Sequence, residues 1–146
     1  MRRSLFAAAA AALLAIGCAT SPPTFRQDDI SSVVEAFNNA SVPAVAEHVR
    51  LPFLVEDQPV YSEADFTAVL ERLRESGLVL DVPSLELRSV PVAPADARFA
   101  LGVYYDELPE NAQAAVMNST VGTVTILVGG NDEGRPQLLG IYRGTR

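Results

Sequence analysis

The spacing of apolar residues changes once along the chain, and this change limits the fold more than any other feature of the sequence. Before residue 77, apolar side chains recur every three or four positions in three segments, which is the period of an amphipathic helix. From Leu85 onward they alternate with polar residues, which is the period of a half-buried strand. Helices followed by strands joined through turns predict an α+β domain whose sheet is antiparallel.

The helical half predicts three helices with clear local signals. They cover residues 28–40, 41–49 and 62–76. The third begins with a serine that can cap its first turn, and Gly77 stands where a helix of this length ends. Residues 50–61 contain a Leu-Pro-Phe sequence and read as extended, because the residue before a proline disfavours the helical conformation.

The second half predicts strands over residues 84–92, 97–108, 120–130 and 136–144. The "NDEG" turn between the last two predicts a hairpin. Residues 107–119 break the alternation, so they predict a connection, either a solvated loop or a short helix.

The N-terminal residues have the features of a targeting signal. A basic start, "MRRS", precedes about a dozen apolar residues, which suits a signal peptide and is too short for a spanning helix. Gly17 and Cys18 follow, and Cys18 is the only cysteine in the chain. We expect residues 1–17 to be removed by a cut between Gly17 and Cys18.

The stretch Leu14-Ala15-Ile16-Gly17-Cys18 resembles the lipobox of bacterial lipoproteins, with Ala15 at the position where that family usually has Leu. The resemblance implies that the Cys18 thiol carries a diacylglycerol whose fatty acyl chains, such as palmitate, anchor the mature protein. The alternative is an ordinary secreted or periplasmic protein, since Ala15-x-Gly17 also fits a signal peptidase that cuts the same bond.

The lipoprotein resemblance also implies a location and a layout. Residue 19 is Ala where the family's inner-membrane members commonly have Asp, so we expect the outer membrane, with the domain facing the periplasm. Residues 18–27 would then be the lipidated cysteine and a short tether, and residues 28–146 a single domain.

The order of segments resembles the nuclear-transport-factor-2-like superfamily, which includes ketosteroid-isomerase-like and polyketide-cyclase-like domains. The likeness lies in "EAFNNASVPAVAEHVRLPF" (35–53), in the third helix ending "LRESG" (73–77) and in the long terminal strands. It implies a strongly bent sheet wrapped around the long helix 62–76, often with a cone-shaped pocket, and frequent homodimers formed through the sheet. It implies no particular activity, because one fold hosts enzymes, binders and scaffolds.

Four residues are candidates for catalysis. Enzymes of this superfamily often place an Asp base and Tyr donors inside the cone, and Tyr104 and Asp106 share a face of the predicted strand 97–108. Asp57 stands in a loop before the third helix, and His48, the only histidine, could act beside a carboxylate. Three of them also have a structural explanation: Asp57 and Asp106 as solvated loop residues, His48 as an exposed residue at a helix end.

Several classes of function are disfavoured. One histidine and one cysteine cannot form a metal site of several His or paired Cys ligands, and no phosphate-binding or dinucleotide-binding glycine motif occurs. We therefore expect neither metal nor cofactor. The formal net charge of −7 disfavours binding to nucleic acid or to anionic lipid head groups.

The sequence thus favours an envelope-anchored lipoprotein whose domain binds a small apolar ligand or a protein partner without catalysis. One alternative is an isomerase, dehydratase or cyclase with an Asp–Tyr pair in the cone. The other is a structural module that dimerises through its sheet. An open cone would favour the first two functions, and a cone filled by apolar side chains would favour the third.

Replacing Cys18 tests the anchor. We expect Cys18→Ala to move the protein from the membrane fraction to the soluble fraction, because two or three acyl chains hold a protein at a bilayer where the polypeptide alone does not. Fractionation of cells followed by mass spectrometry of the mature N-terminus measures both location and lipid. Ser21→Ala in the tether is the control, and unchanged membrane fractionation of Cys18→Ala would refute the anchor.

Overall fold

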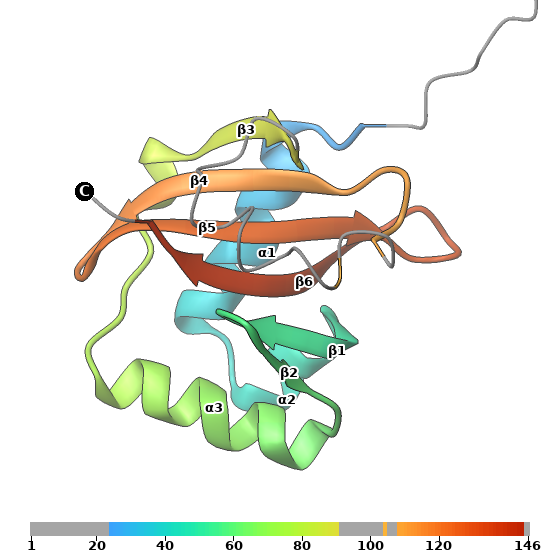
Figure 1. Ribbon diagram of the computed structural model, residues 1–146. Coiled ribbons are helices and arrows are strands. Elements are labelled where there is room, and N and C mark those ends of the chain that lie inside the picture. Colours follow the sequence, from blue (N-terminus) through green and yellow to red (C-terminus); the bar gives the residue numbers. More distant parts are fainter. Residues whose placement is uncertain (1–23, 91–103, 105–107, 145–146) are drawn as a thin grey trace, which may run out of the picture.

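The architecture is seen in a computed structural model that describes residues 24–90, 104 and 108–144 (Figure 1). The prediction of an α+β chain is confirmed. The helices are α1 (Gln27–Asn39), α2 (Val42–Ala46), α3 (Glu63–Glu75) and the short 3-10 helix η1 (Val82–Ser84). The strands are β1 (Val49–Val55), β2 (Gln58–Val60), β3 (Glu86–Ser89), β4 (Gln113–Ser119), β5 (Gly122–Gly130) and β6 (Pro136–Arg143).

The strands form one open sheet in the order β2-β1-β6-β5-β4-β3. Four of the neighbouring pairs are antiparallel, but β1 and β6 run parallel. The prediction of an antiparallel sheet was therefore wrong for this pair. The alternation of apolar residues shows that a strand exists and which of its faces is buried, whereas β1 and β6 are joined by no turn that could indicate their pairing.

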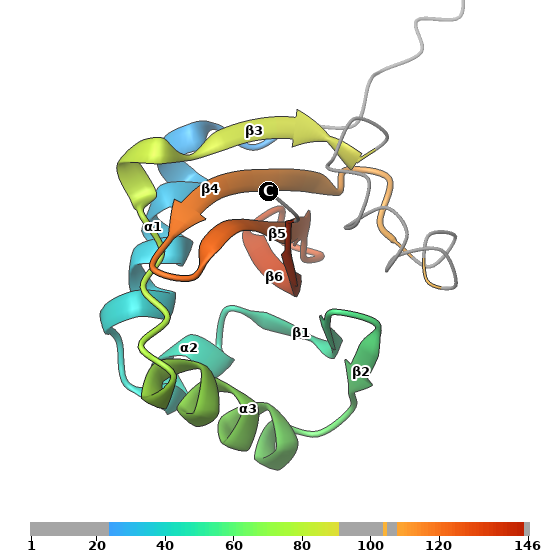
Figure 2. The same cartoon turned by 60° about the vertical axis from the view of Figure 1, so that its left-hand side comes forward.

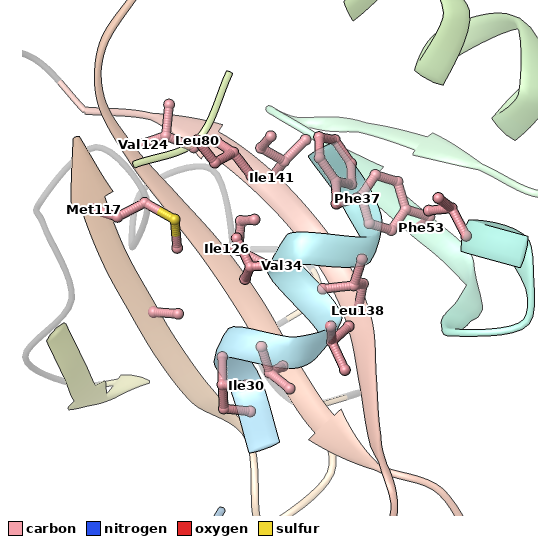
Figure 3. Close-up of a cluster of buried hydrophobic side chains, with 14 of the residues drawn as sticks. Ile30, Val34, Phe37, Phe53, Leu80, Met117, Val124, Ile126, Leu138 and Ile141 are labelled. Atoms are coloured by element: carbon pink, nitrogen blue, oxygen red, sulfur yellow. The ribbon is translucent and has the colours of Figure 1, made fainter. Parts of the chain in front are cut away.

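Helix α1 lies across one face of the sheet, behind it in the view of Figure 1. Its apolar stripe includes Ile30, Val34 and Phe37, all of which are buried. They belong to one buried cluster with Ile126 and Leu138 of the sheet, and Figure 3 shows Val34 beside Ile126 and Phe37 beside Phe53. Burying this stripe is the largest contribution that α1 can make to stability, because the apolar surface is removed from water.

The long helix α3 does not occupy the position expected for it. It packs on α2 and, through Phe66, on Phe53 of β1, with the two rings edge to face at 5.1 Å between centroids. Figure 2 shows α3 and the β1–β2 hairpin below the other four strands, with α1 beside them. The helix that the sheet packs around is thus α1, and the expected cone around residues 62–76 is not what the structure shows.

Both ends of α3 follow the local signals in the sequence. Ser62 Oγ accepts a hydrogen bond from the backbone N–H of Asp65 at 3.1 Å. At the other end Gly77 has a φ of 77°, and the N–H of Leu78 donates to the carbonyl of Leu73 at 3.1 Å. This is the Schellman arrangement, in which a left-handed glycine ends a helix.

Arg74 links the ends of two helices. Its guanidinium donates to the backbone carbonyls of Phe37 and Ala40, each at 2.8 Å. These carbonyls lie at the C-terminus of α1, where no intrahelical donors remain. The C-terminal half of α3 is thereby held against the end of α1.

The region around β4 differs from its prediction. Residues 113–119 form a strand rather than a connection, and Ala114 to Met117 are all buried. A strand between two others, buried on both faces, shows a continuous apolar run instead of alternation, and alanine disfavours strands. Of the strand predicted at 97–108, only Tyr104 and Leu108 are described, and neither is in a strand.

The short second helix ends earlier than expected. It stops at Ala46, His48 lies in a turn, and Val49 begins β1. The carbonyl of His48 is therefore available to the sheet, and it accepts a hydrogen bond from the N–H of Leu138 at 2.7 Å. His48 and Val49, which the helical pattern assigned to the helix, therefore lie instead in the turn and strand that pair with β6.

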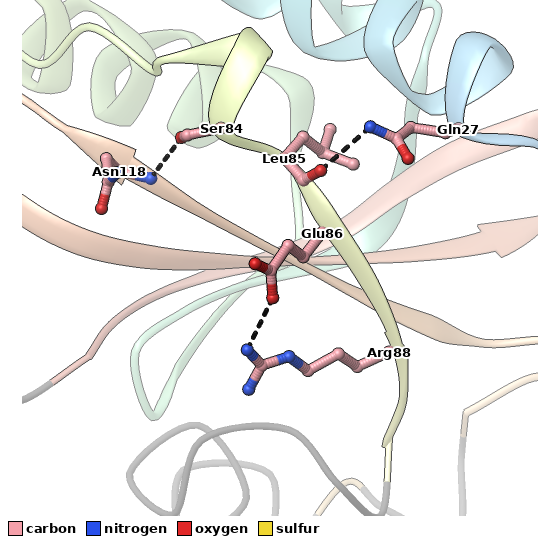
Figure 4. A network of polar contacts seen from close by, with 6 residues as sticks. All are labelled: Gln27, Ser84, Leu85, Glu86, Arg88 and Asn118. Carbon is pink, nitrogen blue, oxygen red and sulfur yellow. Dashed lines mark hydrogen bonds and ion pairs between the residues drawn. The ribbon is translucent and has the colours of Figure 1, made fainter.

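Polar contacts hold η1 and β3 in place (Figure 4). Gln27 of α1 donates through Nε2 to the carbonyl of Leu85 at 3.0 Å, and the N–H of Asn118 on β4 donates to Ser84 Oγ at 2.8 Å. An exposed ion pair joins Arg88 to Glu86 along β3 at 2.8 Å. The residues that lead into β3 are therefore hydrogen-bonded both to α1 and to β4.

Residues just before Asp28 also contact the folded core. Phe25 packs against the core, and its N–H donates to Gln113 Oε1 at 2.8 Å. In residues 24–90 and 108–144, no helix is long and apolar enough to span a membrane.

Gly140 tests the β1–β6 pairing. A Cβ at this position would lie 2.9 Å from both the carbonyl oxygen and the Cβ of Leu54 on β1. We expect Gly140→Ala to lower the free energy of unfolding by about 1–3 kcal/mol, as overpacking does. Urea denaturation measures this. The control is Gly144→Ala, whose new methyl would meet its nearest atoms at 3.4 Å, and equal stability of the two variants would contradict the prediction.

Candidate functional site

A cleft of about 450 Å³ opens between α3 and the sheet, and we call it the α3 cleft. Its volume lies within the range of about 300–1,000 Å³ typical of small-molecule sites. Its two walls belong to segments that are far apart in the sequence and lie one above the other in Figure 2. The lining residues are Val55, Glu56, Val69, Arg72, Leu73, Ser76, Leu78, Val121, Val124, Ile141 and Arg143.

One wall is a face of α3. Val69, Leu73 and Ser76 are spaced so that they share one side of the helix, next to the side from which Phe66 and Leu70 enter the core. The apolar stripe of α3 is wider than the core can cover. Val69 and Leu73 are therefore only partly buried, and they give the cleft an apolar wall.

The other wall comes from the sheet. Val55, Val124 and Ile141 lie on the face of the sheet that also carries the main core, because alternate residues of a strand share a face. Leu78 lies in the segment after α3 and Val121 at the tip of the β4–β5 hairpin. Val121 remains 48% exposed, which is high for a valine.

Charged groups line part of the cleft. Arg143 Nε lies 2.8 Å from Glu56 Oε1, and the backbone N–H of Arg143 donates to the same oxygen at 3.1 Å. Glu56 stands in the β1–β2 turn at a φ of 56°, and this turn brings its side chain to the end of β6. Arg72, by contrast, has no carboxylate within ion-pair distance in the described part of the chain.

The chemistry of the cleft suits binding. Among its lining residues there is no tyrosine or histidine, and the one carboxylate, Glu56, is held by Arg143. General acid–base catalysis needs a group that can exchange a proton with the substrate, and the oxygen Oε1 of Glu56 is already bonded to Arg143. The geometry therefore offers apolar contact and positive charge.

The predicted pair of Tyr104 and Asp106 is described only in part. Asp106 lies outside the described residues. Tyr104 is in a turn and packs on a second apolar cluster that includes Leu54 and Tyr142. Because Leu54 and Val55 point to opposite faces of the sheet, Tyr104 is on the face opposite the α3 cleft, beside a smaller groove of about 180 Å³.

The other two candidates lie apart from each other and from the cleft. Asp57 is exposed in the β1–β2 turn and accepts a hydrogen bond from Gln58 Nε2 at 3.0 Å, while its neighbour Glu56 lines the cleft. His48 is exposed at the opposite end of β1 and lines a groove of about 410 Å³ with Glu47 and Arg135. The structure does not bring these candidates together.

The remaining sequence predictions concern lipid and metal. Gly17 and Cys18 lie outside the residues that the structure describes. Within residues 24–90, 104 and 108–144, no three His, Cys, Asp or Glu side chains are grouped so that they could hold a metal ion.

The sequence did not indicate that the hydroxyl of Tyr142 is buried. Its hydroxyl has no hydrogen-bond partner in the described structure and sits in the second apolar cluster. Burial raises the pKa of Tyr142 well above its usual value, and the nearby Glu56 and then Tyr104 raise it further. Nothing in the alternation of β6 distinguishes this tyrosine from an apolar residue.

Tyr142 makes stability depend on pH in the alkaline range. The pKa of a tyrosine in the unfolded chain is about 10, so above that pH the unfolded state loses a proton that folded Tyr142 retains. Stability should therefore fall as the pH rises above about 10. We expect Tyr142→Phe to reduce this fall and to leave stability at neutral pH equal or higher. Urea denaturation at several pH values measures both, and an unchanged alkaline slope would contradict the role of Tyr142.

Comparison with known proteins gives no family for this chain. The chain matches no family model, and it has no significant similarity to a curated protein or to a solved structure. The α3 cleft is therefore the main evidence for a function.

Proposed function

We propose that this protein is an envelope lipoprotein, anchored through Cys18, whose domain binds a small apolar ligand in the α3 cleft and catalyses no reaction. The observation that carries the proposal is the cleft itself: valine and leucine side chains of α3 face valine and isoleucine side chains of the sheet across about 450 Å³. Apolar walls with a few polar groups are the usual make-up of small-molecule sites.

The location is part of the same proposal. The lipobox-like sequence ending at Cys18 supports attachment to a membrane, and Ala19 supports the outer membrane with the domain in the periplasm. Little polypeptide separates Cys18 from Phe25, which already packs on the core. An anchor at Cys18 would therefore keep the domain close to the bilayer surface.

We also propose that the domain is related to the nuclear-transport-factor-2-like superfamily. The order of two helices, a β1–β2 hairpin, a third helix and then the remaining strands supports this relationship. The α3 cleft would correspond to an opening at one end of the bent sheet.

The two other functions have less support. A catalytic Asp–Tyr pair would need Tyr104 near the cleft, and Tyr104 packs on the opposite face of the sheet. A purely structural module agrees with the apolar side chains that fill the space between α1 and the sheet, including Ile30, Phe37 and Ile126. It leaves the exposed apolar walls of the α3 cleft without a role.

Filling the cleft tests the proposal. We expect Val69→Phe to weaken binding of the neutral fluorescent dye Nile red about tenfold, since an overpacked contact costs about 1–3 kcal/mol. The control is Val79→Phe, a similar change at a valine that is 53% exposed and does not line the cleft. Fluorescence titration of the full-length protein measures the affinity.

The apolar N-terminal run can also bind the dye, but it is the same in the wild type and in both variants. The difference between Val69→Phe and Val79→Phe therefore reports the cleft alone. If both variants bound Nile red as the wild type does, the α3 cleft would not be the binding site. Circular dichroism of each variant shows that it is folded.

A further inference from the structure

We infer that the ligand of the α3 cleft is an apolar molecule that ends in a single carboxylate, the chemistry of a fatty acid, and that Arg72 binds this carboxylate. The inference rests on the proposed function, because it takes the apolar cleft as the binding site. It is carried by the charges at the cleft and by the position of Arg72 between its apolar residues.

Arg72 combines exposure with contact to the cleft. It lines the cleft together with Val69 and Leu73, which lie on either side of it along the same face of α3, and its side chain is exposed. An arginine placed in this way can keep its aliphatic part on the apolar wall and its guanidinium at the solvent. A ligand lying against that wall would present its polar end to Arg72.

Among the charged residues that line the cleft, Arg72 is the one that forms no ion pair in the described structure. Glu56 and Arg143 form an ion pair at 2.8 Å, so together they contribute no net charge. Glu71 and Glu75 lie near Arg72 on α3, but neither is within ion-pair distance of its guanidinium in the described structure. Among the residues that line the cleft, one positive charge therefore remains without an ion pair, and it matches a ligand with one negative charge.

A carboxylate is the anion that best fits this single group. The planar guanidinium can donate two parallel hydrogen bonds to the two oxygens of a carboxylate. A phosphate group carries more charge and is generally met by more than one donor. Ser76 supplies no alternative donor on this wall, because its hydroxyl already donates to the carbonyl of Leu73 at 2.6 Å.

The size and charge of the protein agree with this choice. A volume of about 450 Å³ is near the lower end of the range for ligand sites, which favours one apolar chain over a lipid with two. The whole protein has a net charge of −7, so its long-range field does not attract anions. An anion would be selected by short-range contact with Arg72.

The experiment compares two probes with the same tail, dodecanoate and dodecan-1-ol, by their displacement of Nile red from the full-length protein. Charge-assisted hydrogen bonds contribute about 1.5–3 kcal/mol, so we expect the wild type to bind dodecanoate at least about tenfold more tightly than the alcohol. Arg72→Gln should remove this preference by lowering the affinity for dodecanoate to that for dodecan-1-ol. Arg50→Gln, at an exposed arginine outside the cleft, should keep the preference.

Each other result overturns a distinct claim. If the wild type binds both probes equally, or if Arg72→Gln weakens both equally, Arg72 does not recognise a carboxylate. If Arg143→Gln removes the preference and Arg72→Gln does not, the anion is bound by Arg143. If dodecyl phosphate binds more than about tenfold more tightly than dodecanoate, the head group is a phosphate. If Val69→Phe leaves the binding of dodecan-1-ol unchanged, the proposed function fails as well.

Discussion

The parallel pairing of β1 with β6 is the contact on which the rest of the structure depends. It joins the unit made of α2, β1, β2 and α3 to the four strands that lie on α1. The pairing is irregular: Val49 pairs with Leu138 and Leu54 with Gly140, so β1 carries extra residues, among them Pro52, which has no N–H to donate. The close approach of Leu54 requires a glycine at position 140. The position of α3, and with it the α3 cleft, follows from this pairing because β2 leads directly into α3.

The sequence predicts well those parts of the fold that depend on neighbouring residues. The start of α3 at Ser62 and its end at Gly77 are set by one hydroxyl and one left-handed glycine, and both were visible in the sequence. The β5–β6 hairpin was equally plain from its turn. What could not be predicted depends on contacts between distant segments. The parallel partner of β1 and the interior strand β4 are examples, since Ala114 and Ala115 become strand residues only because β3 and β5 flank them.

The candidate site was harder to predict than the fold. The candidates from the sequence, His48, Asp57, Tyr104 and Asp106, are side chains that can transfer protons. Tyr104 and Asp106 were chosen from the resemblance to a superfamily. The α3 cleft is built instead from ordinary residues such as Val69 and Val124, which any core could contain. Arg72 is an exposed residue of α3, and only the sheet opposite makes it part of the cleft. A single sequence does not distinguish the residues of a mostly apolar site from those of a core.

The bonds from Arg74 to the end of α1 have a consequence for how such a cleft can vary. Leu73, next in sequence, lines the cleft, while Arg74 is fastened to the backbone of another helix at 2.8 Å. At the other end of α3, the edge-to-face contact of Phe66 with Phe53 also involves no lining residue. These contacts form a frame beside the β1–β6 pairing, which itself includes the lining residues Val55 and Ile141. Substitutions among the other lining residues can reshape the interior while that frame keeps its dimensions, which leaves specificity free to drift without loss of the fold.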